Sequence, residues 1–278
     1  MMNRFGLSIL TLASVVALAP TANAFDIKGW NYSVDSDNDS TSINGVGGTE
    51  FEIYGSAVQQ HDGKTRFAAR TKMPLDGVLR EAAEGGRISW GDLIINIACD
   101  ALDQVGRESL FGIRFAANNE SGVSGLGVYG DIELMENAQG NNNHTASLAE
   151  HNEYVIGEGG SPQTGTLPIS YFDESTHVPS LIKSGTFLGA VEIIEDTSSW
   201  GLEGFDRLGG HTIALQWDYN LIPTQQGQEV CYHLTPECNN DIQGGTYTTA
   251  VPTPAAVLPV LSGLFAAAKR KGKKEALS

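Results

Sequence analysis

The sequence predicts an all-β, mainly antiparallel protein: a β-sandwich or jelly-roll-like ectodomain with a short helical insert. Two observations support this prediction. Several short segments rich in β-branched and aromatic residues are separated by Gly-rich turns, and the chain contains 33 glycines. Only one clear stretch has apolar residues at helical spacing. Both ends of the chain have the composition of export signals, so we expect the ectodomain to occupy residues 25–243.

The first 24 residues have the composition of a secretory signal peptide. Arg4 supplies a positive charge, the run from Phe5 to Leu18 is mostly apolar, and Ala22-Asn23-Ala24 is an A-x-A-like cleavage site. We therefore expect signal peptidase to recognise Ala22 and Ala24 and to leave a mature chain that begins at Phe25.

The first half of the mature chain is predicted to form strands. The segment from Thr49 to Val58 alternates, with Phe51, Ile53 and Gly55 on one face and Glu50, Glu52 and Tyr54 on the other. The turn His61-Asp62-Gly63 then predicts a hairpin. The other expected strands are Ile27–Val34, Arg66–Thr71, Ile88–Ala98, Phe111–Ala116 and Val128–Met135.

The second half of the chain contains the predicted helical insert. Leu148 and Val155 recur at helical spacing within Ser147–Ile156, and Ser147 is a suitable N-cap. A further helical turn is expected at Pro179–Lys183. Later strands are expected at Phe187–Glu195, His211–Tyr219 and Val230–Leu234, and residues 244–254 are predicted to form a linker that includes the proline motif.

An acidic run follows the first predicted strand. Asp35, Asp37 and Asp39 stand at alternate positions, which resembles the start of a calcium-binding loop. The rest of the EF-hand pattern is missing, because Ser40 and Val46 occupy the positions of the usual Gly and Glu. The alternative is a solvated loop whose side chains satisfy turn backbone. Calcium is the one candidate cofactor, with these three aspartates as its ligands.

The chain contains three cysteines. In an exported protein, Cys231 and Cys238 are close enough in sequence to close a small disulfide loop. Cys99 is then left over, as a small buried hydrophobic residue. Their spacing does not fit a zinc site.

The formal net charge of −16 excludes one class of partner. The predicted signal segments carry more basic than acidic residues, so the mature body is more acidic still. Such a body repels the phosphate backbone, and we expect no nucleic-acid binding.

The C-terminal region has three joined parts. Val251-Pro252-Thr253-Pro254 is a short proline motif, followed by an apolar segment at residues 255–268 that we expect to cross the membrane as a helix. A basic cluster then begins the tail at residues 269–278, which the positive-inside rule places in the cytoplasm. The cluster consists of Lys269, Arg270, Lys271, Lys273 and Lys274.

This tripartite layout resembles the PEP-CTERM sorting signal of Gram-negative bacteria, although Thr253 stands where Glu is usual. The runs Gly29–Tyr32, Phe51–Gly55, Trp90–Leu93, Leu110–Phe115, Ser121–Val123 and Cys238–Asp241 are similar to those of a cyanobacterial family of exosortase-dependent surface proteins. The resemblance implies that an exosortase removes the tail and that the product reaches the cell surface. It implies no reaction.

The sequence therefore predicts an exported, non-catalytic protein of the cell surface or extracellular matrix, first anchored in the inner membrane, with exopolysaccharide as a candidate partner. The alternative is a secreted carbohydrate-binding module or polysaccharide hydrolase. Pairs such as Asp131 with Glu133 and Glu192 with Glu195 have the residue types for glycoside hydrolysis, and Trp200 is the tryptophan that could stack on a sugar.

Overall fold

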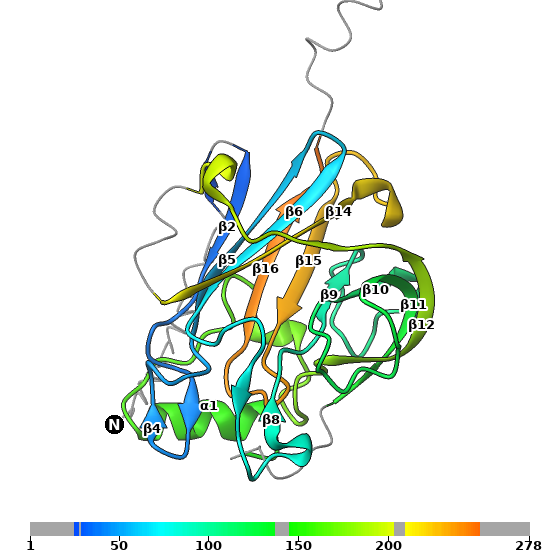
Figure 1. The fold of residues 1–278 in the computed structure, drawn as a ribbon. Coiled ribbons are helices and arrows are strands. Elements are labelled where there is room, and N and C mark those ends of the chain that lie inside the picture. Colours follow the sequence, from blue (N-terminus) through cyan, green and yellow to red (C-terminus); the bar gives the residue numbers. More distant parts are fainter. Residues whose placement is uncertain (1–24, 28, 137–144, 203–208, 251–278) are drawn as a thin grey trace, which may run out of the picture.

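The computed structural model describes residues 25–27, 29–136, 145–202 and 209–250 (Figure 1). The predicted signal peptide at residues 1–24 and the proline motif, membrane segment and basic tail at residues 251–278 lie outside the described residues. Within the described ranges, no helix is long and apolar enough to cross a membrane.

The described chain folds mainly into two six-stranded sheets whose neighbouring strands all pair antiparallel, which confirms the all-β prediction. The first sheet contains, in spatial order, β1 (Phe25–Ile27), β2 (Trp30–Val34), β5 (Ile53–His61), β6 (Lys64–Thr71), β14 (His211–Asp218) and β13 (Glu192–Ile193). The second sheet contains β12 (Leu181–Gly189), β11 (Gly127–Met135), β10 (Leu110–Arg114), β9 (Leu93–Asn96), β15 (Glu229–Leu234) and β16 (Gln243–Thr248).

Smaller elements surround the two sheets. Two short ribbons pair β3 (Thr41–Ser42) with β4 (Gly45–Val46) and β7 (Val78–Leu79) with β8 (Arg87–Ile88). The α-helix is α1 (Leu148–Gly157), and it lies at the same end of the molecule as β4 (Figure 1). Single 3₁₀ turns occur at η1 (Glu84–Gly86), η2 (Arg107–Ser109), η3 (Ile169–Tyr171), η4 (Ser198–Trp200) and η6 (Tyr219–Leu221).

The two sheets share one hydrophobic core. Phe67 and Leu215 from the first sheet belong to the same buried cluster as Ile95 and Ile113 from the second. Fully burying a side chain of this size contributes about 1.5–3 kcal/mol. The faces of the two sheets are therefore held together by apolar packing.

The predicted hairpin and the predicted helix are both confirmed. Asp62 and Gly63 have φ angles of 49° and 77°, as a tight two-residue turn requires, and they join β5 to β6. Ser147 caps α1 by accepting a hydrogen bond from the Glu150 backbone at 3.2 Å. Leu148 and Val155 are buried, so the helical spacing identified the buried face.

Three other predictions about elements are corrected. The expected strand Ile88–Ala98 is interrupted, because Trp90 forms an isolated bridge with Pro236 before β9 begins. The expected helical turn at Pro179–Lys183 instead leads into β12. The expected linker is wrong over residues 244–248, which belong to β16. Its glycines are needed for packing, since a Cβ at Gly245 would lie 2.4 Å from the Tyr232 hydroxyl.

The predicted disulfide is also corrected. Cys231 bonds to Cys99, with their Cα atoms 5.1 Å apart, and Cys238 is buried and unbonded. Cys99 follows β9, and β9 pairs with the strand β15 that carries Cys231. Sequence spacing could not reveal this juxtaposition, which is created by the sheet.

Candidate metal centre

Four carboxylates are buried together near the loop that follows β2. Asp35 directly follows β2, Asp39 lies in the loop before β3, Glu52 directly precedes β5, and Asp241 lies in the loop between β15 and β16. Their exposed fractions are 7%, 1%, 0% and 1%, respectively. Acidic residues are rarely buried to this extent unless they are paired or bound to a metal.

Three of these carboxylates converge on one point. One oxygen from each of Asp39, Glu52 and Asp241 lies within 4.8 Å of the other two. Asp35 is electrostatically coupled to this group, because the charge of Asp39 raises the pKa of Asp35 and the charge of Asp35 raises the pKa of Asp241. Of the three aspartates predicted as ligands, Asp39 belongs to the converging group, Asp35 is buried outside it, and Asp37 is exposed.

One oxygen of each of three carboxylates is held in place by hydrogen bonds. The Gln163 backbone N–H donates to Asp39 Oδ2 at 2.7 Å, and the Ser40 hydroxyl donates to Glu52 Oε2 at 2.7 Å. The Gly165 backbone N–H donates to Asp35 Oδ1 at 3.2 Å. These bonds fix the orientation of each carboxylate.

Asp241 is held at both oxygens. Its Oδ2 accepts from the Ile53 backbone N–H at 2.6 Å, and its Oδ1 accepts from Ile242 at 2.7 Å. The neighbouring carbonyl of Asn240 accepts from the Thr41 backbone N–H at 2.7 Å. The loop before the last strand is thereby attached to Thr41, which follows the acidic run, and to Ile53, the first residue of β5.

The second oxygen of the other three carboxylates has no hydrogen-bond donor. Asp35 Oδ2, Asp39 Oδ1 and Glu52 Oε1 are all buried without a partner. A buried acceptor left unsatisfied costs about 1–3 kcal/mol, and more when the group is charged. Asp39 and Glu52 belong to the group of three, so a proton, a water molecule or a bound cation would satisfy their free oxygens.

The pKa values of the four carboxylates show that burial disfavours their charged forms. Burial raises the pKa of Asp39 to about 7 and also raises the pKa of Glu52. Burial raises the pKa of Asp35 and of Asp241 well above the usual value, and the charge of Asp39 adds to both shifts. Among the described residues, no salt bridge joins any of the four to a basic side chain.

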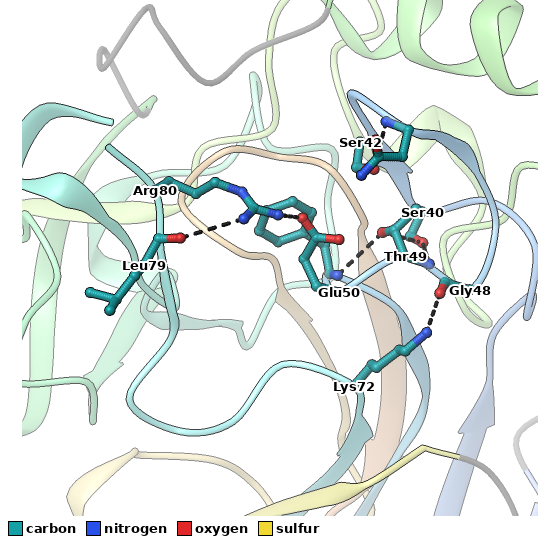
Figure 2. Close-up of polar contacts among 10 residues, drawn as sticks. Ser40, Ser42, Gly48, Thr49, Glu50, Lys72, Leu79 and Arg80 are labelled. Carbon is teal, nitrogen blue, oxygen red and sulfur yellow. Dashed lines mark hydrogen bonds and ion pairs between the residues drawn. The ribbon is translucent and has the colours of Figure 1, made fainter. Parts of the chain in front are cut away.

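Two basic side chains near the connection from β2 to β5 bind groups other than the four carboxylates, and Figure 2 shows their partners. Lys72 donates to the carbonyl of Gly48, and Arg80 pairs with Glu50. Arg80 also lies 5.9 Å from the centre of the Phe51 ring. The predicted strand Thr49–Val58 begins only at Ile53, so the expected alternation does not extend to Glu50 and Glu52. Glu50 pairs with Arg80, whereas Glu52 is fully buried.

A second buried acidic group differs from the first in being fully satisfied. Asp92 accepts from the Asn119 amide at 2.7 Å, the Ser121 hydroxyl at 2.7 Å and the Ile182 backbone at 2.8 Å. Glu237 likewise accepts a backbone N–H at each oxygen. Asp92 joins its loop to β12, and Glu237 joins its loop to the backbone at Ser89 and Glu120. Neither carboxylate has a buried oxygen without a hydrogen-bond donor.

The other candidate residues from the sequence form ordinary contacts. Lys183 donates a hydrogen bond to Glu133, which lowers the pKa of that acid. Glu192 accepts from Gln216 at 2.8 Å and from Lys64 at 2.9 Å, and these bonds lower its pKa. Trp200 is buried against Trp30, with ring centres 5.7 Å apart, so it does not offer a surface for a sugar.

Scans against family models, curated proteins and solved structures find no match to this chain.

Proposed function

We propose that this protein is an exported, non-catalytic component of a bacterial cell surface or extracellular matrix, with a structural or interaction role. The observation that supports it best is the Cys99–Cys231 disulfide, which joins residues 132 positions apart. Disulfides of this kind persist in oxidising compartments outside the cytoplasm. A cross-link between the segment that follows β9 and strand β15 favours a body that folds after export.

The terminal segments give the proposed route. Signal peptidase removes residues 1–24, and the apolar segment at residues 255–268 holds the precursor in the inner membrane. An exosortase then cuts near Val251–Pro254, as the resemblance to PEP-CTERM proteins implies. The described body, which we assign as a β-sandwich because its two sheets share a core, is released to the surface.

The acidic side chains favour a role without catalysis. A glycosidase needs an acid with a raised pKa beside a second carboxylate, both within reach of the sugar. The carboxyls with the most strongly raised pKa values are buried, whereas Glu133 and Glu192 have lowered pKa values. Binding of exopolysaccharide on the outer surface remains the proposed interaction.

Variants of the proline motif test this proposal in a Gram-negative host that carries an exosortase. Replacing both prolines (Pro252→Ala with Pro254→Ala) should leave the protein in the membrane fraction. Thr253→Glu is the matched control, because it restores the usual motif and should be released at least as well as the wild type. Release of the double variant at the wild-type level would refute processing at this motif.

A further inference from the structure

We propose that Asp35, Asp39, Glu52 and Asp241 form a structural calcium site. This inference goes beyond the proposed function and does not depend on it, because the purified chain either binds the ion or does not. The first observation is geometric: oxygens of Asp39, Glu52 and Asp241 lie within 4.8 Å of one another. This spacing suits oxygens that share one ion, since calcium–oxygen distances are about 2.3–2.6 Å.

The second observation is the set of unpartnered oxygens. Asp35 lies outside the group of three, is 7% exposed, and has a buried Oδ2 without a hydrogen-bond donor. Asp39 Oδ1 and Glu52 Oε1 are likewise buried without a donor. In each case the sister oxygen accepts a hydrogen bond, so the side chain is held and one oxygen is left for a ligand.

The donor set selects the ion. Every candidate ligand is a carboxylate oxygen, and no histidine or cysteine belongs to the group. Such hard donors favour calcium or magnesium over zinc and copper. Calcium accepts six to eight oxygens in flexible geometry, whereas magnesium requires a near-ideal octahedron and retains waters. Calcium fits better, because these carboxylates come from three separate segments and are buried.

The location of the site defines its role. Asp35 and Glu52 lie at the two ends of the connection from β2 to β5, Asp39 lies within it, and Asp241 precedes the last strand, β16. A cation shared by them would join the first part of the body to its last strand. The ligand oxygens are buried, so the ion is structural and no substrate reaches it.

The test uses the full chain in a mild detergent, stripped with EGTA and exchanged into chelator-free buffer. Calorimetric titration with CaCl₂ should show one ion bound per chain. The melting temperature should rise by about 5–10 °C at a hundredfold excess over Kd. MgCl₂ should bind at least about tenfold more weakly. No heat and no shift with calcium would overturn the proposal, and equal binding of magnesium would overturn the choice of ion.

Two substitutions locate the site. Glu52→Gln removes a buried ligand charge and should abolish both the calcium heat and the melting shift. Asp37→Asn is the matched control: it changes an exposed aspartate of the same acidic run and should leave both responses unchanged. If Asp37→Asn lost the response and Glu52→Gln retained it, the buried site would be refuted. If Glu52→Gln failed to fold, the wild-type titration would still decide the proposal.

Discussion

At the scale of a single residue, the buried His233 makes the stability of the fold depend on pH. Its Nε2 hydrogen-bonds to the Pro179 carbonyl at 2.9 Å, and its ring packs on Tyr171 and Phe172. Burial lowers its pKa from 6.5 to about 4. Between pH 6.5 and about 4, His233 binds a proton in the unfolded chain but not in the folded chain. The contribution of the neutral, buried His233 to folding stability is therefore lost as the pH falls through this range.

His233→Gln tests this dependence, because glutamine can still donate to Pro179 but does not titrate. The variant should be less stable than the wild type near pH 7.5, since it loses the ring packing. The difference in unfolding free energy should shrink by on the order of 3 kcal/mol as the pH falls to about 4. Urea denaturation at several pH values measures it, and a constant difference would contradict the assignment.

The carboxylate cluster shows how far single residues can be predicted from the sequence. The alternating acidic run indicates Asp35 and Asp39 as candidate ligands, because closely spaced acids are a local signal, whereas the third candidate, Asp37, is exposed. Glu52 and Asp241 are not among those candidates, since they approach Asp39 only when the loop before β5 meets the loop before β16. Both lie within longer runs of the sequence that carry no local signal of that contact.

At the scale of elements, the disulfide should contribute strongly to stability. It closes a loop between residues 132 positions apart, and a cross-link of this span contributes about 4–5 kcal/mol in the chain-entropy account. Cys99→Ala should therefore lower the unfolding free energy by about that amount. Cys238→Ala is the control, because it removes only one buried thiol and should cost about 1 kcal/mol. Similar losses in chemical denaturation of the two variants would contradict the assigned pairing.

The last strand offers a second test at this scale. Gly245→Ala would place a Cβ 2.4 Å from the Tyr232 hydroxyl, which bonds to Ser56 at 2.8 Å. We expect a loss of about 1–3 kcal/mol from overpacking. Gly210→Ala has open space around the new Cβ and should change stability by less than about 1 kcal/mol. Equal melting temperatures for the two variants would show that β16 does not pack closely at this position.

Elements with clear alternation or a clear turn were predictable. The hairpin of β5 and β6 follows from its Asp-Gly turn, and α1 follows from its cap and its spacing. The last strand, β16, has the composition of a loop, because Gln243–Thr248 contains two glycines. The sequence therefore predicts a linker where the structure has a strand. Here tertiary packing, and not local propensity, requires small residues.

At the scale of the whole molecule, the last described strand ends before the proposed sorting motif at Val251–Pro254 begins. This strand ends at Thr248, and the Ala250 backbone donates to Gln60 at 2.8 Å. Removal of residues beyond Pro254 should therefore leave the melting temperature of the body unchanged. Differential scanning calorimetry of the precursor and of the released product, at equal calcium concentration, measures this. A clear difference would mean that the tail contributes to the fold.

The intact mass of protein recovered from the cell surface and the growth medium is the most direct test of export and processing. We predict a chain that begins at Phe25, contains one disulfide and lacks the segment that follows the proline motif. A mass that retains residues 255–274 would contradict it. The protein would then be a membrane-anchored one, and its acidic body would act at the membrane.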